Sequence, residues 1–138
     1  MQIHKEIKFT GDKTDCAPLD LCSYVWSNVQ LWQATPLEEM QKRLTEDFEE
    51  LDRAEYRVTD DSGNTLAVMV IVVDERDRHT GKPVIQPLIA FSKIPGLLTP
   101  AYRWMIQLAK AAKIEWYLTT KQDISTGDEV IRWRKIKP

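Results

Sequence analysis

The sequence predicts one α/β domain of the α+β type, residues 1–138, in which a mixed, mostly antiparallel sheet carries helices on both faces. The run from Leu66 to Val73 is apolar without alternation, which is typical of a central strand covered on both faces. Residues 55–59 form another strand pattern, joined to this run by turn-forming Asp, Ser, Gly and Asn residues, so a hairpin is predicted. Residues 83–120 have the pattern of a strand, a glycine-containing loop, an amphipathic helix and a strand, which together make a βαβ unit.

Length and composition are those of an ordinary globular domain. The chain has 138 residues, of which 43% are hydrophobic and 29% charged, and it is long enough to bury one sizeable core. The apolar run at 66–73 is too short to cross a bilayer, and the opening MQIHKEIKF lacks the apolar core of a signal peptide. We therefore expect a cytoplasmic protein without a membrane segment.

The cysteines and histidines predict neither a disulfide nor a metal site. Cys16 and Cys22 are six positions apart, which on a helix places them on different faces, so free, partly buried thiols are expected. His4 and His79 have no cysteine or carboxylate at metal-ligand spacing around them. Both histidines are expected at the surface.

The first third of the chain predicts a strand and two helices. Residues 3–9 alternate apolar and polar side chains, the pattern of a half-buried strand. Thr14 or Asp15 can cap a first helix that ends near Gln30. Thr35, followed by proline, predicts the N-cap of a second helix. The apolar stripe of this second helix has spacings of three or four residues: Leu37, Met40, Leu44, Phe48 and Leu51.

The middle of the chain predicts a solvated hairpin end, a broken strand and a third helix. Residues 74–82 are a run of acids and bases, expected at the surface. The returning strand at 84–93 contains Pro87, which cannot donate to a strand ladder and so predicts a bulge. Thr99 and Pro100 predict the N-cap and first residue of the third helix. Further strands are expected at 114–119 and 130–136, separated by a polar turn at 122–128.

The last predicted strand is basic, although the formal net charge of the chain is −2. An acidic balance argues against bulk affinity for nucleic acid. One interpretation is that the cations keep an edge strand from pairing with other chains. The other is phosphate contact combined with base stacking. The residues concerned are Arg132, Trp133, Arg134, Lys135 and Lys137.

In this order, β-α-α-β-β-β-α-β-β, the chain resembles the GNAT-type N-acetyltransferase fold over nearly its whole length. Residues 55–73 resemble the central hairpin of that family, 84–93 the strand that splays from its neighbour at a bulge, and 99–120 the next helix and strand. The resemblance implies that the pantetheine arm of acyl-coenzyme A lies along the splayed strand. It also implies that a Gln/Arg-x-x-Gly-x-Gly/Ala loop holds the pyrophosphate at the helix start. The positions that it assigns to the cofactor are Phe91, Lys93, Gly96, Leu97, Leu98 and Thr99.

The chain departs from the family pattern at the residues that carry chemistry. In residues 93–98, lysine stands at the Gln/Arg position and leucine at the second small position, where an isobutyl group would crowd a pyrophosphate. Strand 84–92 has no acid, and its only polar side chains are Gln86 and Ser92. Tyr117, the candidate proton donor to a leaving thiolate, lies within a strand, where packing is its expected role. The family's fourth helix is replaced by the turn at 122–128, and no catalytic residue is predicted.

Three hypotheses follow. The favoured one is a GNAT-like domain that has lost acyl-coenzyme A chemistry, binds no cofactor and acts as an interaction or assembly protein, with a protein partner or as a homo-oligomer. Its resemblance to compact tailed-phage products, virion proteins among them, suggests a phage origin and a place in the host cytoplasm or the virion. The second is a divergent acetyl-CoA-dependent N-acyltransferase that uses Lys93 and the amides of 96–99, with Glu55 or an acid of 74–77 as base. The third is nucleic-acid contact through the basic strand.

Overall fold

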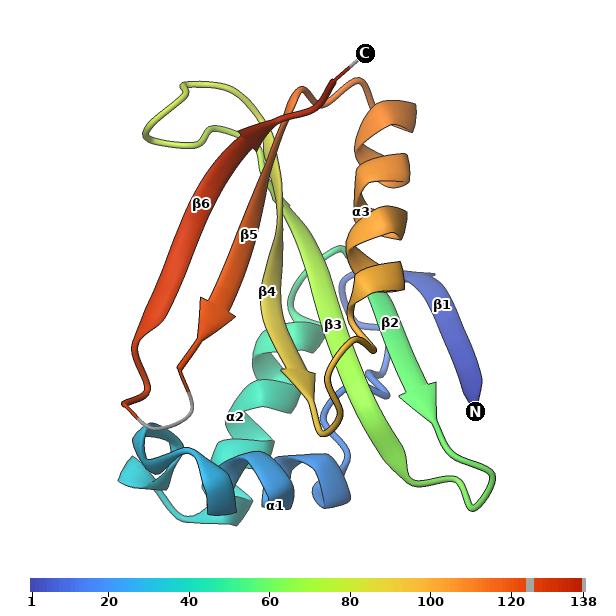
Figure 1. Cartoon of the computed structure of the whole chain (residues 1–138), viewed down its shortest axis with the longest axis vertical. Coiled ribbons are helices and arrows are strands. Elements are labelled where there is room, and N and C mark those ends of the chain that lie inside the picture. Colours follow the sequence, from blue (N-terminus) through green and yellow to red (C-terminus); the bar gives the residue numbers. More distant parts are fainter. Residues whose placement is uncertain (124–125, 138) are drawn as a thin grey trace.

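The computed structural model describes residues 1–123 and 126–137. Its strands are β1 (Gln2–Lys8), β2 (Arg53–Thr59), β3 (Thr65–Asp74), β4 (Val84–Ser92), β5 (Trp116–Gln122) and β6 (Glu129–Lys135). Its helices are α1 (Leu19–Asn28), the short 3-10 helix η1 (Gln30–Ala34), α2 (Leu37–Glu49) and α3 (Thr99–Ala111). The six strands form one open sheet in the order β1-β2-β3-β4-β5-β6 (Figure 1), and all neighbours are antiparallel except β4 and β5. The α+β class and the predicted element order are confirmed.

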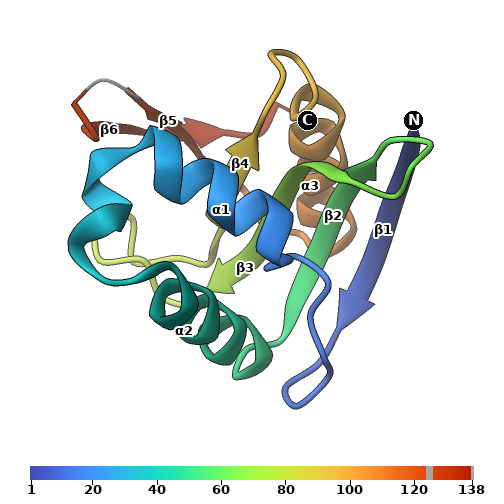
Figure 2. The same cartoon turned by 90° about the horizontal axis from the view of Figure 1, so that it is seen from below.

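The two faces of the sheet carry separate hydrophobic cores. α1 and α2 cover one face, and α3 covers the other (Figure 2). β3 contributes to both cores: Val68 and Val70 pack with α1 and α2, whereas Ala67 and Met69 pack with α3. All four side chains are fully buried. The prediction of a central strand covered on both faces is therefore confirmed.

β4 is bent by a β-bulge beside Pro87. Val70 of β3 pairs with Ile89, and Ile71 pairs with Pro87, so Leu88 has no residue opposite it on β3. Because proline lacks an amide hydrogen, the ladder is interrupted at this point. The predicted break in pairing is confirmed.

The first helix begins later than its sequence pattern predicts. α1 starts at Leu19, after Pro18, and neither Thr14 nor Asp15 caps it. The Thr14 hydroxyl instead donates to a carboxylate oxygen of Glu55, at 2.6 Å, and the backbone amide of Asp15 donates to the other oxygen. The Thr14 oxygen accepts from the nearby Cys16 amide, at 3.0 Å, ahead of the helix start at Leu19.

The other two α-helices begin one residue away from the predicted position, α2 one residue later and α3 one residue earlier. α2 starts at Leu37 without a side-chain cap, and the hydroxyl oxygen of Thr35 is buried with no hydrogen-bond partner among the described residues. α3 starts at Thr99 itself, with Leu98 in the cap position. η1 was not predicted, because its five residues are too few to show a helical period.

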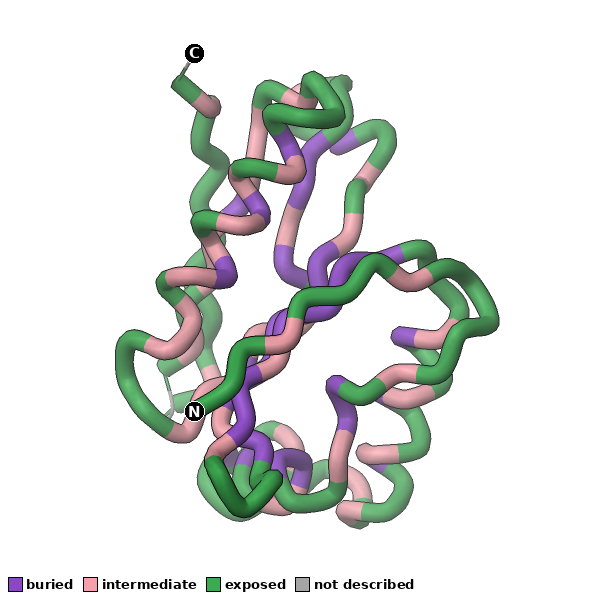
Figure 3. The backbone as a smooth tube through the Cα atoms, turned by 90° about the vertical axis from the view of Figure 1, so that its right-hand side faces the viewer, coloured by how far each residue is buried: buried purple, intermediate pink, exposed green. Residues whose placement is uncertain are grey.

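β1 carries its apolar side chains on an exposed face, so the prediction of a half-buried strand is wrong. Ile3, Ile7 and Phe9 are 51%, 55% and 62% exposed. The side chains that pack under α3 come from β2 and the strands beyond it, because α3 does not extend over the sheet edge. In Figure 3 the tube of β1 is mostly in the colour of exposed residues.

The connection between β3 and β4 folds back onto the sheet. Asp77 is only 6% exposed, and its carboxylate accepts hydrogen bonds from the amides of His79 and Thr80 and from the indole N–H of Trp133 on β6. The His79 and Trp133 rings lie 4.4 Å apart. The predicted solvated hairpin end is therefore wrong at Asp77, because the sequence does not reveal that β6 lies beside this connection.

Two further predictions concern the cysteines and the membrane. Cys16 and Cys22 are both free, as expected, and they are fully buried where partial burial was expected. Within 1–123 and 126–137, no helix has the length and apolar character needed to cross a bilayer.

Candidate functional site

The candidate site is a cleft between β4 and β5. These parallel strands are joined only at Val84–Trp116 and Ile85–Tyr117, beyond which they diverge (Figure 1). The space between them is a cleft of about 490 Å³, bounded by α1, η1, α3 and the two strands. At its far end the loop after β5 approaches η1, where a side chain at Gly127 would contact Leu31. The cleft is open, and its lining is mostly apolar.

Large apolar side chains stand at the rim of this cleft. Tyr24 of α1, Leu31 of η1 and Leu88 of the β4 bulge all line it, and they are 37%, 61% and 40% exposed. Phe91 does not fill the space, because its ring packs edge-on against Trp32 at 5.5 Å and is 8% exposed. An exposed apolar rim around a hollow is typical of a binding surface.

One edge of β4 faces the cleft without a strand partner. β4 pairs with β3 along its length, but the described residues give its other edge a partner only at Val84 and Ile85. From residue 86 to residue 92, the backbone amides and carbonyls on this edge therefore have no strand to bond to. Such groups are strong donors and acceptors, so the edge can accept an added extended chain.

The facing edge of β5 is partly satisfied by a side chain. The Tyr102 hydroxyl of α3 donates to the Thr120 carbonyl at 3.2 Å and accepts from the Thr120 amide at 3.3 Å. Tyr102 thus replaces the strand neighbour that β5 lacks at this residue. The two walls of the cleft differ, because β5 is tied to α3 whereas β4 keeps a free edge.

The loop at 93–98 does not present a free cation to the cleft. The Lys93 ammonium lies 3.7 Å from an Asp20 carboxylate oxygen and 5.7 Å from the centre of the Tyr24 ring. The Leu97 carbonyl accepts a hydrogen bond from the buried Tyr56 hydroxyl at 2.9 Å, and Gly96 has a φ of 88°, which favours glycine. This loop is held by contacts to β2 and α1.

The six residues assigned to a cofactor by the resemblance are separated by the structure. Phe91 and Leu98 line the cleft. Lys93, Gly96, Leu97 and Thr99 are not among its lining residues. The amides of residues 96–98 have no hydrogen-bond partner in the described part of the chain, and they stand at the start of α3. These amides are the feature that most favours an anion here.

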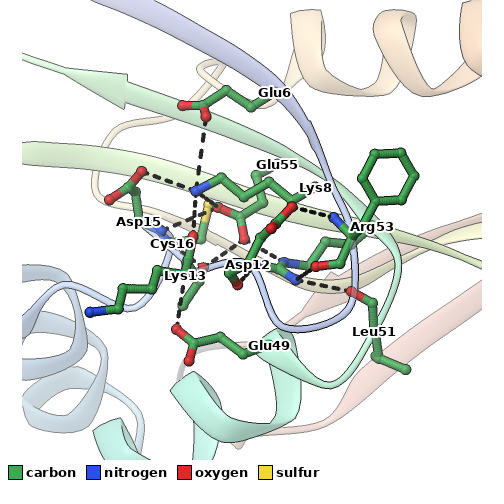
Figure 4. A network of polar contacts seen from close by, with 12 residues as sticks. Glu6, Lys8, Asp12, Lys13, Asp15, Cys16, Glu49, Leu51, Arg53 and Glu55 are labelled. Atoms are coloured by element: carbon green, nitrogen blue, oxygen red, sulfur yellow. Dashed lines mark hydrogen bonds and ion pairs between the residues drawn. The ribbon is translucent and has the colours of Figure 1, made fainter.

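Glu55, one candidate base, is held in a polar network remote from the cleft (Figure 4). Its carboxylate accepts from Arg53 Nε at 2.7 Å, from the Thr14 hydroxyl and from the Asp15 amide, and Lys8 Nζ lies 3.7 Å away. Burial acts to raise the pKa of Glu55, but these hydrogen bonds and Lys8 outweigh it, so the pKa lies below its ordinary value. A carboxylate held ionised in this way is a weak base, and its role is to fasten residues 9–18 to the sheet.

The other predicted acids are also placed outside the cleft. Asp77 organises the β3–β4 connection through the bonds described above. The one carboxylate that lines the cleft in the described ranges is Glu129 of β6, and it is exposed. Sequence reasoning missed Glu129, which is brought to the cleft by its pairing with Gln122 across the β5–β6 hairpin. The described lining contains no histidine and no cysteine.

The basic residues of β6 gather beside α3 rather than along the strand alone. Arg132 and Arg134 pair with Thr119 and Tyr117, and they line two hollows of about 350 and 570 Å³ with Lys110 of α3 and Lys121 of β5. These four cations form no ion pair with any described residue. We call them the basic groove.

The remaining members of the predicted basic strand differ in their availability. Lys135 and Lys137 line the larger hollow. Trp133 is held by Asp77 and His79, so its ring is not free for stacking on that side. Lys110 and Lys121 were missed from the sequence, because they lie on other elements and only the fold brings them to β6.

Comparisons with known proteins give no assignment. No protein-family model matches the chain, and a search of curated proteins finds no significant match. Among the described residues, no group of three or more His, Cys, Asp or Glu side chains is arranged to hold a metal ion. The cleft and the basic groove are therefore interpreted from their own geometry.

Proposed function

We propose that this chain is a GNAT-like domain that acts by protein–protein contact, as an interaction or assembly protein, and not by acyl transfer. The observation that carries the proposal is the cleft itself, where a free strand edge and an apolar rim occur together and the described lining residues include no histidine, cysteine or buried acid. Such a site can bind an extended chain but offers no general base set against a nucleophile.

The partner that this cleft fits is an extended peptide segment. Its main chain would pair with the free edge of β4, and alternate side chains would contact Leu88 on one wall and Leu31 at the far end. The resemblance to tailed-phage products makes a virion component of the same assembly a suitable source of such a segment.

Acyl transfer is the alternative, and two features weigh against it. Lys93 is already paired with Asp20, and the isobutyl side chain of Leu98 lines the cleft where a pyrophosphate-binding loop would carry a small residue. The unpartnered amides at 96–98 and Glu129 are the features in its favour. Acetyl-CoA binding therefore belongs in the test.

The test is selection of peptides from a displayed library of random 12-residue sequences. We expect peptides that bind the wild-type protein and lose binding to the Leu31→Asp, Leu88→Asp double variant, since both side chains are exposed and at the rim. Leu19→Asp, an exposed α1 position outside the cleft, is the matched control. Enriched peptides that bind the double variant equally well would contradict the proposal. So would saturable micromolar acetyl-CoA binding with acyl transfer to an amine.

A second candidate, nucleic-acid contact, is favoured by the four cations of the basic groove, which form no ion pair with a described residue. Phosphate contacts from such cations would make binding strongly salt-dependent. We expect a fluorescent 15-residue oligothymidine to bind the wild type and not the Arg132→Glu, Arg134→Glu variant. Lys42→Glu with Arg43→Glu on α2 gives the same change of net charge as a control. Binding that is insensitive to salt, or is lost equally in the control, would contradict this candidate.

A further inference from the structure

β1 is an edge strand whose outer edge is not covered by any described element. It is first in the sheet order, and only β2 pairs with it in the described part of the chain. Its seven residues contain no proline, and their pairing with β2 shows no register shift. A regular edge of this kind is a template for pairing with another strand.

The same strand and the two residues that flank it, Met1 and Phe9, carry a row of exposed apolar side chains. Met1, Ile3, Ile7 and Phe9 are 51–70% exposed. Ile3 lies opposite Val58 and Ile7 opposite Ala54 of β2, so the row continues the α3-side core outward past the edge of the sheet. Nothing in the described chain covers these side chains.

We propose that two copies of this chain associate through antiparallel pairing of β1 with β1, about a two-fold axis at Lys5. A two-fold axis perpendicular to the sheet keeps each side chain on its own face. One residue must therefore lie opposite its own copy at the axis. The axis at Lys5 opposes Ile3 to the partner's Ile7 and His4 to the partner's Glu6. It also opposes Met1 to the partner's Phe9. Two apolar contacts and an imidazole–carboxylate contact thus occur on each side of the axis.

Neighbouring registers lose this complementarity. An axis at His4 would oppose Ile3 to the partner's Lys5 and place the two imidazoles together. An axis at Glu6 would oppose Lys5 to the partner's Ile7 and place two carboxylates together. The Lys5 register has one like-charge contact, at the axis, and the Lys5 ammonium is directed toward its own α3, with Nζ 6.0 Å from the centre of the Trp104 ring. The sequence of β1 is therefore self-complementary in one register.

The pairing is independent of the cleft, which lies four strands along the sheet. It would join two sheets into one of twelve strands and bury the apolar rows of both copies. Because only one strand of each copy takes part, the contact area is small. We therefore expect a weak dimer, with a dissociation constant on the order of micromolar. This surface is distinct from the one proposed for a peptide partner, and either can fail without the other.

Directed disulfide cross-linking tests the register. Side chains directly opposite in an antiparallel pair have Cβ atoms about 4.5–5.5 Å apart, which is near the separation that a disulfide spans. Lys5→Cys should therefore give a covalent dimer under mild oxidation. Gln2→Cys should not, because the axis places its two copies about 20 Å apart along the strands. Both native thiols are buried, so the oxidised wild-type protein serves as the control for cross-linking through Cys16 or Cys22.

A mixture of two variants gives a stricter test. Ile3→Cys and Ile7→Cys should each form no covalent dimer under oxidation when alone and should form a covalent heterodimer when mixed. Sedimentation velocity of the wild type should show concentration-dependent dimerisation, which Ile3→Glu with Ile7→Glu abolishes and Leu19→Glu does not. A wild-type monomer at 200 µM, or cross-linking of Gln2→Cys as fast as of Lys5→Cys, would overturn the proposal.

Discussion

The polar network at β2 and the cleft between β4 and β5 differ in whether their polar groups have hydrogen-bond partners. In the network, Arg53 donates to Glu55 at 2.7 Å, to the Leu51 carbonyl at 2.9 Å and to the Asp12 carbonyl at 2.7 Å. Both charged side chains are nearly inaccessible, yet each has several partners. In the cleft, the edge of β4 from residue 86 to residue 92 is accessible and has no strand partner among the described residues. Saturated polar groups fix a structure, whereas unsatisfied accessible ones leave it able to bind.

The largest effect is expected from breaking the network at Glu55. Glu55→Gln leaves the Arg53 guanidinium buried without its counter-charge, so we expect a loss of about 3 kcal/mol or more in the free energy of unfolding. Urea denaturation followed by circular dichroism measures it. Glu46→Gln, which removes the exposed partner of Lys42, should change the stability by less than about 0.5 kcal/mol. Equal effects of the two variants would show that the network is not what fastens residues 9–18.

The same network should make the stability depend on acid pH. Because the folded pKa of Glu55 lies below its ordinary value of 4.5, its contribution is present above that value and is lost as the pH falls through the folded pKa. We expect the urea midpoint to fall as the pH is lowered below about 4.5, with a shallower fall in Glu55→Gln. The pKa values of Asp52, Asp60 and Asp77, which accept backbone hydrogen bonds, are also lowered and contribute to the remaining slope. Parallel slopes would contradict the assignment to Glu55.

A smaller effect is expected on the cleft side, from Tyr102→Phe. The variant removes the two hydrogen bonds to Thr120, so we expect a loss of about 1 kcal/mol. Amide hydrogen exchange at Thr120 should become faster, while exchange in β2 stays unchanged. Tyr24→Phe, at the rim of the cleft, is the control. Unchanged exchange at Thr120 would show that strand pairing holds this part of β5 without the Tyr102 hydroxyl.

The smallest effect is expected from Trp32→Phe. The Trp32 indole N–H is buried without a partner in the residues that the structure describes, so its removal should change stability by less than about 0.5 kcal/mol or increase it. Trp26→Phe is the matched comparison, because the Trp26 N–H donates to the Thr35 carbonyl at 2.9 Å. That variant should lose about 1 kcal/mol. Thermal denaturation of both measures the difference, and a larger loss at Trp32 would contradict this interpretation.

The sequence predicts much of the sheet, because the signals for it are local. The unbroken apolar run of β3 indicates a strand covered on both faces. Pro87 indicates the bulge, because proline has no amide hydrogen to donate to a neighbouring strand in any fold. The helix starts are less predictable. Thr14 is a competent cap by itself, but it bonds to a residue 41 positions away, and no local pattern contains that partner.

The candidate site is less predictable than the fold for the same reason. Glu129 reaches the cleft only through the β5–β6 pairing, and Lys110 joins the basic groove only through the position of α3. The alternation in β1 correctly gives a strand, but whether its apolar face is covered depends on how far α3 extends over the sheet. The alternation of apolar residues identifies which face of a strand is apolar, but not whether another element covers that face.

The bulge and the short β4–β5 pairing have a mechanical consequence. Strand pairing fastens the β5–β6 hairpin to the rest of the sheet at one end only, through Val84 and Ile85. A small rotation of the hairpin about these two pairs would displace its far end more than its paired end. The width of the cleft near Leu88 is thus set by a few contacts, among them the Tyr102 hydroxyl and the Asp77–Trp133 bond. We expect such a rotation to change the width of the cleft and to move Tyr117 and Ile136, which the hairpin packs against the α3-side core.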